Sequence, residues 1–275
     1  MIHLPVFCIP VGMHLVVPFS LVNQSYSRIN FSLGHGVGVA ASILSHCSPL
    51  TAAYSIAKGF RRRFDLMEVC HDNKLLCYSC LLIGWGLVAD IEFDTSKYRW
   101  IGPIRYTLGA LSNVTNPTYY KLRVSYLPAK EQTMKFCTGE GCTVCNSPVK
   151  SDDENSNGWV VEEGLFMQVA AFNLSDSTKG HRIAPYAHAS DGCMDLVIMK
   201  DISRKEYIEL YNSIGTGSYV DGNFFMDDKL GYVKVKAFRV ESLDGPCNVG
   251  IDGIRYVQEQ TIEVSILPSV ATLGA

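Results

Sequence analysis

The strongest constraint on the fold is the way turn residues divide most of the chain into short runs of alternating apolar and polar side chains. The clearest runs are YVKVKAFRV at 232–240 and TIEVSIL at 261–267. Alternation of period two is typical of strands with one buried face. The triplet DNK at 72–74 separates two further β-like runs and predicts a hairpin turn. Many short strands and few helices favour an antiparallel sandwich, which we predict from about residue 64 onward.

Helical signals are few. Ser203 and Glu206 have the spacing of a capping box, and the helix that follows would carry four apolar or aromatic residues on one face: Tyr207, Leu210, Tyr211 and Ile214. Thr95 or Ser96 is expected to begin another helix, which Gly102-Pro103 interrupts before it continues through IRYTLGAL. The remaining β-like runs are expected to be strands: 60–71, 74–93, 119–127, 158–174 and 193–201.

The segment before residue 64 has a different character. Residues 33–59 begin with glycines and continue with small residues, which predicts a turn that enters helices, as in an α/β unit. Residues 1–22 contain no Asp, Glu, Lys or Arg, but Pro5, Pro10 and Pro18 would break a helix, so we predict no membrane span there.

These patterns together predict an α+β fold with two units. The first, residues 1–63, is the end of an α/β domain. The second, residues 64–275, is the antiparallel β-sandwich, and it includes a polar loop near 129–157 that is expected to be mobile.

Charge and cysteine content limit the class of partner. The 275 residues have a formal net charge of −3, so no general positive field attracts nucleic acid, and we predict no nucleic-acid partner. The ten cysteines do not form a disulfide pattern in a chain of this length, and reduced thiols predict a cytoplasmic location. Cys137, Cys142 and Cys145 have spacings compatible with zinc, but no fourth ligand follows closely, so a surface loop with free thiols and no metal is the preferred interpretation.

Charged residues gather in GWGLVADIEFDTSKYRWIGPIRYT, residues 84–107. The acids Asp90, Glu92 and Asp94 come first, and the bases follow: Lys97, Arg99 and Arg105. Taken alone, the acids are compatible with the polar end of a strand. The same order also suits a site that holds a cation on one side and phosphates on the other.

Long blocks in this region carry a family resemblance. The run WGLVADIEFDTSKYRWIGPIRYTLGAL, then TYYKLRVSYLPA, APYAHASDGCMDLVIMKD and VGIDG, resembles the sphingosine kinases in the same order. The resemblance covers about residues 64–270 and the upstream GHGVGVAASIL; the SDG block at 190–192 is shared by the wider diacylglycerol kinase-like superfamily. It implies an N-terminal ATP-binding α/β domain, of which residues 1–63 would be a truncated and interrupted remnant, and a lipid-binding β-sandwich.

The resemblance also implies roles for individual residues. Glu92, with Asp90 beside it on the same strand face, would hold the amine of a sphingoid base. The residues expected at ATP are Gly34, His35 and Gly36 in a backbone turn, Arg99 and Arg105 at the phosphates, and Asp252 with Gly253 near the nucleotide. Mg²⁺ would accompany ATP. His181, Arg182 and His188 are expected to be surface residues without a role.

Departures from the family pattern limit the expected activity. Val37 and Ile254 stand where the family has asparagine and glutamate, and the chain has no G-D-G triplet, whose aspartate is the family's general base. We therefore assign no catalytic residue and predict an incomplete sphingosine kinase-type lipid kinase that makes sphingosine 1-phosphate as part of a fuller enzyme, peripheral to membranes. The alternative is a catalytically incompetent fragment or isoform that only binds sphingoid lipid or protein partners.

Overall fold

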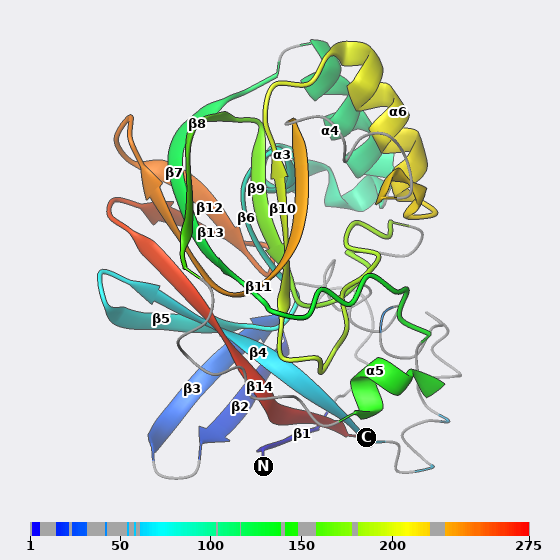
Figure 1. The fold of residues 1–275 in the computed structure, drawn as a ribbon, viewed down its shortest axis with the longest axis vertical. Helices are drawn as coiled ribbons and strands as arrows, with labels where there is room; N and C mark the ends of the chain where they lie inside the picture. The colour runs from blue at the N-terminus through cyan, green and yellow to red at the C-terminus, as the bar shows by residue number, and fades with distance from the viewer. Residues whose placement is uncertain are drawn as a thin grey trace.

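One large, curled β-sheet dominates the computed structural model (Figure 1). The structure describes residues 2–5, 15–21, 24–31, 42, 54, 58, 61–102, 104–115, 117–138, 141–147, 158–177, 181–220 and 229–274. Twelve strands form the sheet in the order β13-β12-β6-β9-β10-β11-β14-β4-β5, with β7 paired to β11 and β8, and β1 paired to β14. All of these pairings are antiparallel except that of β1 with β14.

The strands and helices have the following bounds. The large sheet contains β1 (Ile2–Pro5), β4 (Arg61–His71), β5 (Lys74–Ser79), β6 (Leu82–Gly86), β7 (Tyr120–Pro128), β8 (Val160–Phe166), β9 (Gln168–Phe172), β10 (Met194–Met199), β11 (Leu230–Ser242), β12 (Cys247–Ile251), β13 (Ile254–Gln258) and β14 (Ile262–Gly274). A separate hairpin pairs β2 (Leu15–Leu21) with β3 (Gln24–Phe31). The helices are α3 (Leu87–Asp94), η1 (Ser96–Ile101), α4 (Ile104–Thr115), α5 (Thr143–Asn146), α6 (Arg204–Ile214) and η3 (Ser218–Val220).

The central strands are buried on both faces, because each face of the sheet packs against its own apolar core. Along β10, Leu196 and Ile198 point into the core enclosed by the curled sheet, whereas Val197 and Met199 point into the core beneath the helices. Figure 1 shows α3, α4 and α6 gathered at one end of the sheet. The predicted α+β class with an antiparallel, sandwich-like sheet is confirmed, whereas the assignment of residues 1–63 to a separate unit stays a prediction.

Two tight turns have backbone angles that explain their sequences. Asp72 and Asn73 have φ of 51° and 59° between β4 and β5, the left-handed pair that a two-residue hairpin requires. The hairpin predicted at 72–74 is confirmed. Asp252 and Gly253, with φ of 46° and 77°, make the equivalent turn between β12 and β13.

One expected strand is a helix. The sequence from Leu87 to Phe93 was expected to continue a strand, but Leu87–Asp94 forms α3. Gly86 causes the change of direction: its φ is +80°, and a Cβ there would lie 2.1 Å from the Met167 carbonyl oxygen. Only glycine fits that approach, so β6 ends at Gly86 and α3 begins beside it.

The helices at 104–115 and 204–214 agree with expectation, and Ser203 with Glu206 forms the predicted capping box. The loop expected near 129–157 differs from expectation in its described part. It contains α5, and it buries Cys142 and Cys145 in the core beneath the helices. Within the residues that the structure describes, no helix is both long and apolar enough to span a bilayer.

The capping box predicts a pH dependence of stability. Hydrogen bonds with Ser203, and then the ammonium of Lys229, lower the pKa of Glu206 to about 2. Because the folded pKa lies below the usual 4.5, this stabilisation is present above pH 4.5 and is lost as the pH falls toward 2. We expect Glu206→Gln to flatten the pH dependence of the urea midpoint below pH 4.5, and Ser203→Ala to cost about 1 kcal/mol at neutral pH.

The control is Glu209→Gln, which removes the exposed pair with Lys205 on the same helix. An exposed pair of this kind contributes little, so its pH profile should follow that of the unchanged chain. If the urea midpoint of Glu206→Gln depended on pH as steeply as that of the unchanged chain, Glu206 would not be the source of the pH dependence.

Candidate functional site

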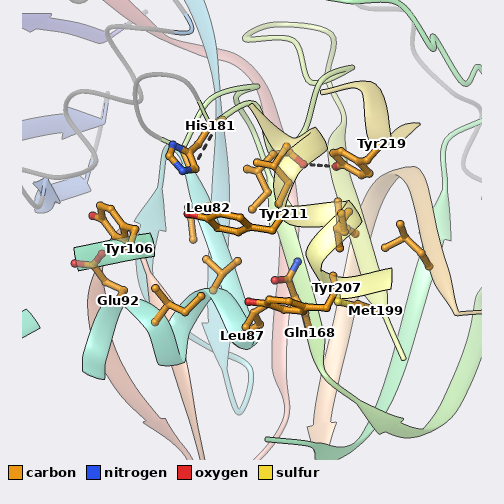
Figure 2. A pocket seen from close by; sticks show the side chains of 18 residues that line it. Leu82, Leu87, Glu92, Tyr106, Gln168, His181, Met199, Tyr207, Tyr211 and Tyr219 are labelled. Atoms are coloured by element: carbon orange, nitrogen blue, oxygen red, sulfur yellow. Dashed lines mark hydrogen bonds between the residues drawn. The ribbon is translucent and has the colours of Figure 1, made fainter. Parts of the chain in front are cut away.

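An apolar cavity lies between the helices and the adjoining face of the sheet (Figure 2). Its volume is about 120 Å³, and it opens to solvent at one side. Helices α3 and α6 form two of its walls, and the remainder comes from strands β6, β9, β10 and β11, the loop before β10, Tyr106 of α4 and Tyr219 of η3. The lining residues are Leu82, Leu87, Val88, Ile91, Glu92, Tyr106, Gln168, Ser177, His181, Ile183, Val197, Met199, Tyr207, Leu210, Tyr211, Ile214, Tyr219 and Leu230.

Polar groups in this cavity are few. Figure 2 shows Glu92, Tyr106 and His181 toward one side of the view and Met199 and Tyr219 toward the other. Glu92 is the one carboxylate among the described lining residues, and His181 Nδ1 has no hydrogen-bond partner in the described part of the chain. An apolar cavity with a few convergent polar groups is the usual form of a small-molecule site.

Glu92 is held by an arginine from the next helix. Arg105 Nη2 donates to both carboxylate oxygens, at 3.0 and 2.9 Å, and Nη1 donates to Thr95 Oγ1 at 3.1 Å. Glu92 and Arg105 are 6% and 5% exposed, so water screens their attraction little. The helices approach closely because α4 carries Gly109, where a Cβ would lie 2.9 Å from Ile91 Cγ2.

Asp90 faces another direction. Its carboxylate accepts from the Tyr120 hydroxyl at 2.7 and 2.9 Å, and burial raises its pKa although this hydrogen bond acts in the opposite direction. The expectation that Asp90 and Glu92 share one face was wrong. It assumed a strand, in which residues two apart lie together, whereas in a helix they are separated by more than half a turn.

Asp252 joins two turns. Its buried carboxylate accepts from the backbone N–H groups of Cys80, Leu81 and Leu82, at 2.8, 3.0 and 3.0 Å, and from Ser79 Oγ at 3.0 Å. These bonds fix the turn between β5 and β6 against the β12–β13 hairpin. A contact between this carboxylate and a nucleotide would therefore have to compete with four protein donors.

The other residues predicted at ATP lie elsewhere or outside the described residues. Gly34, His35 and Gly36 are outside the described residues, as is the side chain of Arg99, whose backbone belongs to η1. Gly253 completes the β12–β13 turn. Arg105 faces Glu92 rather than solvent, so the described structure brings Arg105 and Glu92 together and places Asp252 separately. The nucleotide contacts stay predictions.

Several lining residues were not anticipated as a site. The sequence placed Tyr207, Leu210, Tyr211 and Ile214 on one helix face, but that periodicity alone does not distinguish a packed core from a cavity wall. Gln168 lies within a buried strand run, and its polarity there was the available signal. His181 had been expected at the surface without a role, and no local pattern connected it with residues of α3.

Comparison with known proteins gives a consistent family result. The family described as "YegS C-terminal NAD kinase beta sandwich-like domain" matches residues 82–273. Sphingosine kinase 1 of Arabidopsis thaliana is 29% identical over 236 residues, which cover 79% of this chain and 47% of that protein. Human ceramide kinase is 30% identical over 178 residues, covering 58% of this chain and 33% of its own length. The chain thus spans about half or less of the length of these relatives.

Solved structures agree on the fold. A crystal structure of a putative diacylglycerol kinase from Bacillus anthracis str. Sterne superposes with a TM-score of 0.52 at 14% identity, covering 88% of this chain and 64% of that one. A second structure of a putative diacylglycerol kinase from the same organism has a TM-score of 0.51 at 17% identity, with the same coverage of both chains. At these identities the likeness concerns the fold alone.

The hydrogen bonds of Asp252 predict a large effect on stability. Asp252→Ala leaves three backbone N–H groups buried without an acceptor, each of which costs about 1–3 kcal/mol. We expect a loss of roughly 3 kcal/mol or more in the free energy of unfolding, measured by urea denaturation. Asp72→Ala is the matched control, because Asp72 occupies the equivalent turn position in an exposed hairpin. Equal losses for the two variants would show that turn geometry, not the buried hydrogen bonds, determines the effect.

Proposed function

Because this chain belongs to the YegS C-terminal, NAD kinase β-sandwich-like family and to the C-terminal region of the diacylglycerol kinase-like lipid kinases, we propose that it supplies the lipid-binding part of a sphingosine kinase-type enzyme. Such an enzyme transfers a phosphoryl group from ATP, with Mg²⁺, to the primary hydroxyl of a sphingoid base and forms sphingosine 1-phosphate. The observation that carries the proposal is the apolar cavity whose described lining contains the single carboxylate of Glu92.

The apolar lining suits a hydrocarbon tail. Each buried methylene contributes about 0.8 kcal/mol, so a tail of roughly ten methylenes gains on the order of 8 kcal/mol before the entropic costs of binding. Aliphatic surface comes from four elements, through Leu87 of α3, Val197 of β10, Leu210 of α6 and Leu230 of β11. A cavity of this composition favours a lipid over a polar metabolite.

The head group would lie at the polar side of the cavity. Glu92 there can accept hydrogen bonds from an ammonium or hydroxyl, while His181 Nδ1 and the Tyr106 hydroxyl lie toward the same side (Figure 2). Asp90, bonded to Tyr120, is not among the lining residues. We therefore propose Glu92 as the main recognition group, with Asp90 outside the cavity.

Arg105 supports a second candidate substrate. Its guanidinium already balances the charge of Glu92, so a cationic amine would add an unpaired positive charge to a buried site. A lipid with a neutral polar head, such as an N-acylated sphingoid, would only exchange hydrogen bonds. Ceramide kinases occur among the relatives, and a neutral head group is therefore the alternative to a free sphingoid base.

Phosphoryl transfer requires a general base and nucleotide-binding groups in addition to the residues of the cavity. The chain has no G-D-G triplet, and the residues proposed at ATP remain Gly34, His35, Gly36, Arg99, Arg105, Asp252 and Gly253. We propose that the 275 residues bind lipid without turning it over, and that phosphoryl transfer belongs to a fuller enzyme. The alternative of a form that only binds lipid or protein partners predicts the same binding and the same lack of turnover.

Binding of fluorescent sphingosine without ATP tests the proposal. Leu210→Trp fills the cavity from α6 and should abolish binding, whereas Ile208→Trp, on the exposed face of the same helix, should leave it unchanged. Glu92→Gln should weaken sphingosine binding by about tenfold, equivalent to 1.4 kcal/mol, and should change ceramide binding less. Equal binding by the Leu210 and Ile208 variants would overturn the cavity as the lipid site.

The lipid that binds decides between the two substrates. Tight binding of ceramide, unaffected by Glu92→Gln, would reject the sphingoid-base proposal in favour of a neutral head group. Adding ATP and Mg²⁺ to the same preparation should give no phosphorylation above background. Turnover that disappears in the Leu210→Trp variant would instead assign catalysis to this chain.

An exposed apolar stripe supports contact with a membrane. Ile104, Leu108 and Leu111 follow helical spacing on α4 and are 64%, 51% and 61% exposed, and Trp100 on η1 is 83% exposed. The same helix carries Tyr106, which lines the cavity. We propose that this stripe rests on a bilayer, from which a lipid substrate enters.

Vesicle sedimentation measures this contact. The double variant Trp100→Ser with Leu108→Ser should reduce the bound fraction several-fold, because each change removes about 2 kcal/mol of apolar transfer free energy. Leu75→Ser, an exposed leucine on β5, is the control and should bind as the unchanged chain does. Equal reduction by all of these variants would contradict a specific membrane-facing stripe.

A further inference from the structure

A second cluster of reactive side chains lies apart from the cavity. Cys137, Cys142 and Cys145, from the segment around α5, meet His188, which follows Cys145 by 43 residues. One ligand atom from each residue lies within 4.8 Å of all the others. His188 is 1% exposed, so its expected position at the surface was wrong, and it supplies the fourth ligand that the sequence around the cysteines lacks.

Three of the six distances between ligand atoms match the edges of a metal tetrahedron. His188 Nδ1 lies 3.4 Å from Cys142 Sγ and 3.6 Å from Cys145 Sγ, and the sulfurs of Cys137 and Cys145 are 3.8 Å apart. Zinc bonds of about 2.3 Å to sulfur and 2.0–2.1 Å to nitrogen give tetrahedral edges of about 3.8 Å between sulfurs and about 3.5 Å between sulfur and nitrogen. None of the eight described cysteines is in a disulfide.

Neighbouring groups orient the ligands. His188 Nε2 lies 3.1 Å from the Lys135 carbonyl oxygen, which can only accept, so Nε2 carries the proton and Nδ1 presents its lone pair to the cluster. A carbonyl partner on the second nitrogen is the usual support of a metal-bound histidine. Ser190 Oγ also donates to the Cys145 carbonyl at 2.8 Å, which fixes the loop that carries this cysteine.

The local charge also suits a zinc–thiolate centre. One Zn²⁺ with three thiolates and a neutral imidazole has one net negative charge. The buried guanidinium of Arg62 donates from Nη2 to Cys137 Sγ at 3.6 Å and balances that charge. Three sulfurs and one nitrogen are a ligand set that prefers zinc over the oxygen-seeking cations Mg²⁺ and Ca²⁺.

We propose that Cys137, Cys142, Cys145 and His188 bind one structural Zn²⁺. Four protein ligands leave no open position, so the ion does not take part in phosphoryl transfer. Its role is to hold the segment around α5 against the loop that contains Ser190 and Asp191. That loop is tied to the sheet by the buried Lys234 Nζ, which lies 2.8 Å from Asp191 and 2.9 Å from Asp195.

Metal analysis of the purified, reduced 275-residue chain tests the proposal. We expect about one zinc per chain, and much less in Cys142→Ser and His188→Ala. Cys70→Ser, which removes a thiol from β4 outside the cluster, should keep the zinc. Zinc that persists at one per chain in the Cys142→Ser/His188→Ala double variant would overturn the assignment.

If the variants fail to fold, a second measurement on the unchanged chain still tests the proposal. Exchange of the metal for Co²⁺ should produce the intense visible and near-ultraviolet absorption of tetrahedral cobalt–thiolate, and chelation should lower Tm. A reduced, folded chain that contains no zinc and gives no such absorption with Co²⁺ would overturn the proposal. The proposal would also be overturned if the chain contained no metal and had a disulfide between Cys137 and Cys145, and if this disulfide formed again when the reduced chain was given zinc.

Discussion

The carboxylate of Asp252 is the interaction on which the geometry of the cavity depends. It receives hydrogen bonds from three consecutive backbone N–H groups at Cys80–Leu82, where β6 begins. That strand leads to Gly86, and Gly86 turns the chain into α3, which carries Glu92. The direction of α3, and hence the polar side of the cavity, follows from where this turn is anchored. A carboxylate suits the position because it only accepts, and all four of its recorded partners donate.

The second constraint is electrostatic. A carboxylate at the wall of an apolar cavity is costly unless it is paired, and Arg105 provides that pair from α4. The pairing prepares Glu92 to accept hydrogen bonds without leaving a lone buried charge in the unliganded chain. It also makes the charge of the incoming head group the main determinant of specificity, since a cation must disturb the pair and a hydroxyl need not.

Sequence reasoning predicted those features that depend on local chemistry. The hairpin at Asp72-Asn73 and the capping box of Ser203 and Glu206 were predicted because each involves neighbours in sequence. The antiparallel class followed from period-two alternation, whereas the role of Glu92 rests on the family resemblance and stays a prediction. The helix α3 was missed because its sequence is as apolar as a strand, and its start is decided by a steric contact between Gly86 and Met167, which are distant in sequence. His181 and His188 were missed for the same reason, since the side chains beside them are distant in sequence: Tyr211 of α6 for His181 and the cysteines around α5 for His188.

The cavity and the cysteine cluster, although separate in space, are parts of one packed core. Cys142 and Cys145 belong to the same apolar cluster as Leu87, Tyr207 and Leu210, which line the cavity. The same apolar cluster contains Tyr232, whose ring packs edge to face on that of Tyr186 with centroids 5.6 Å apart and whose hydroxyl donates to buried Asp195. Protein interiors are close-packed and transmit strain, so loosening α5 would affect the packing of α6 through this shared core. A metal ion at the cysteine cluster would therefore stabilise the shape of the lipid cavity without touching its occupant.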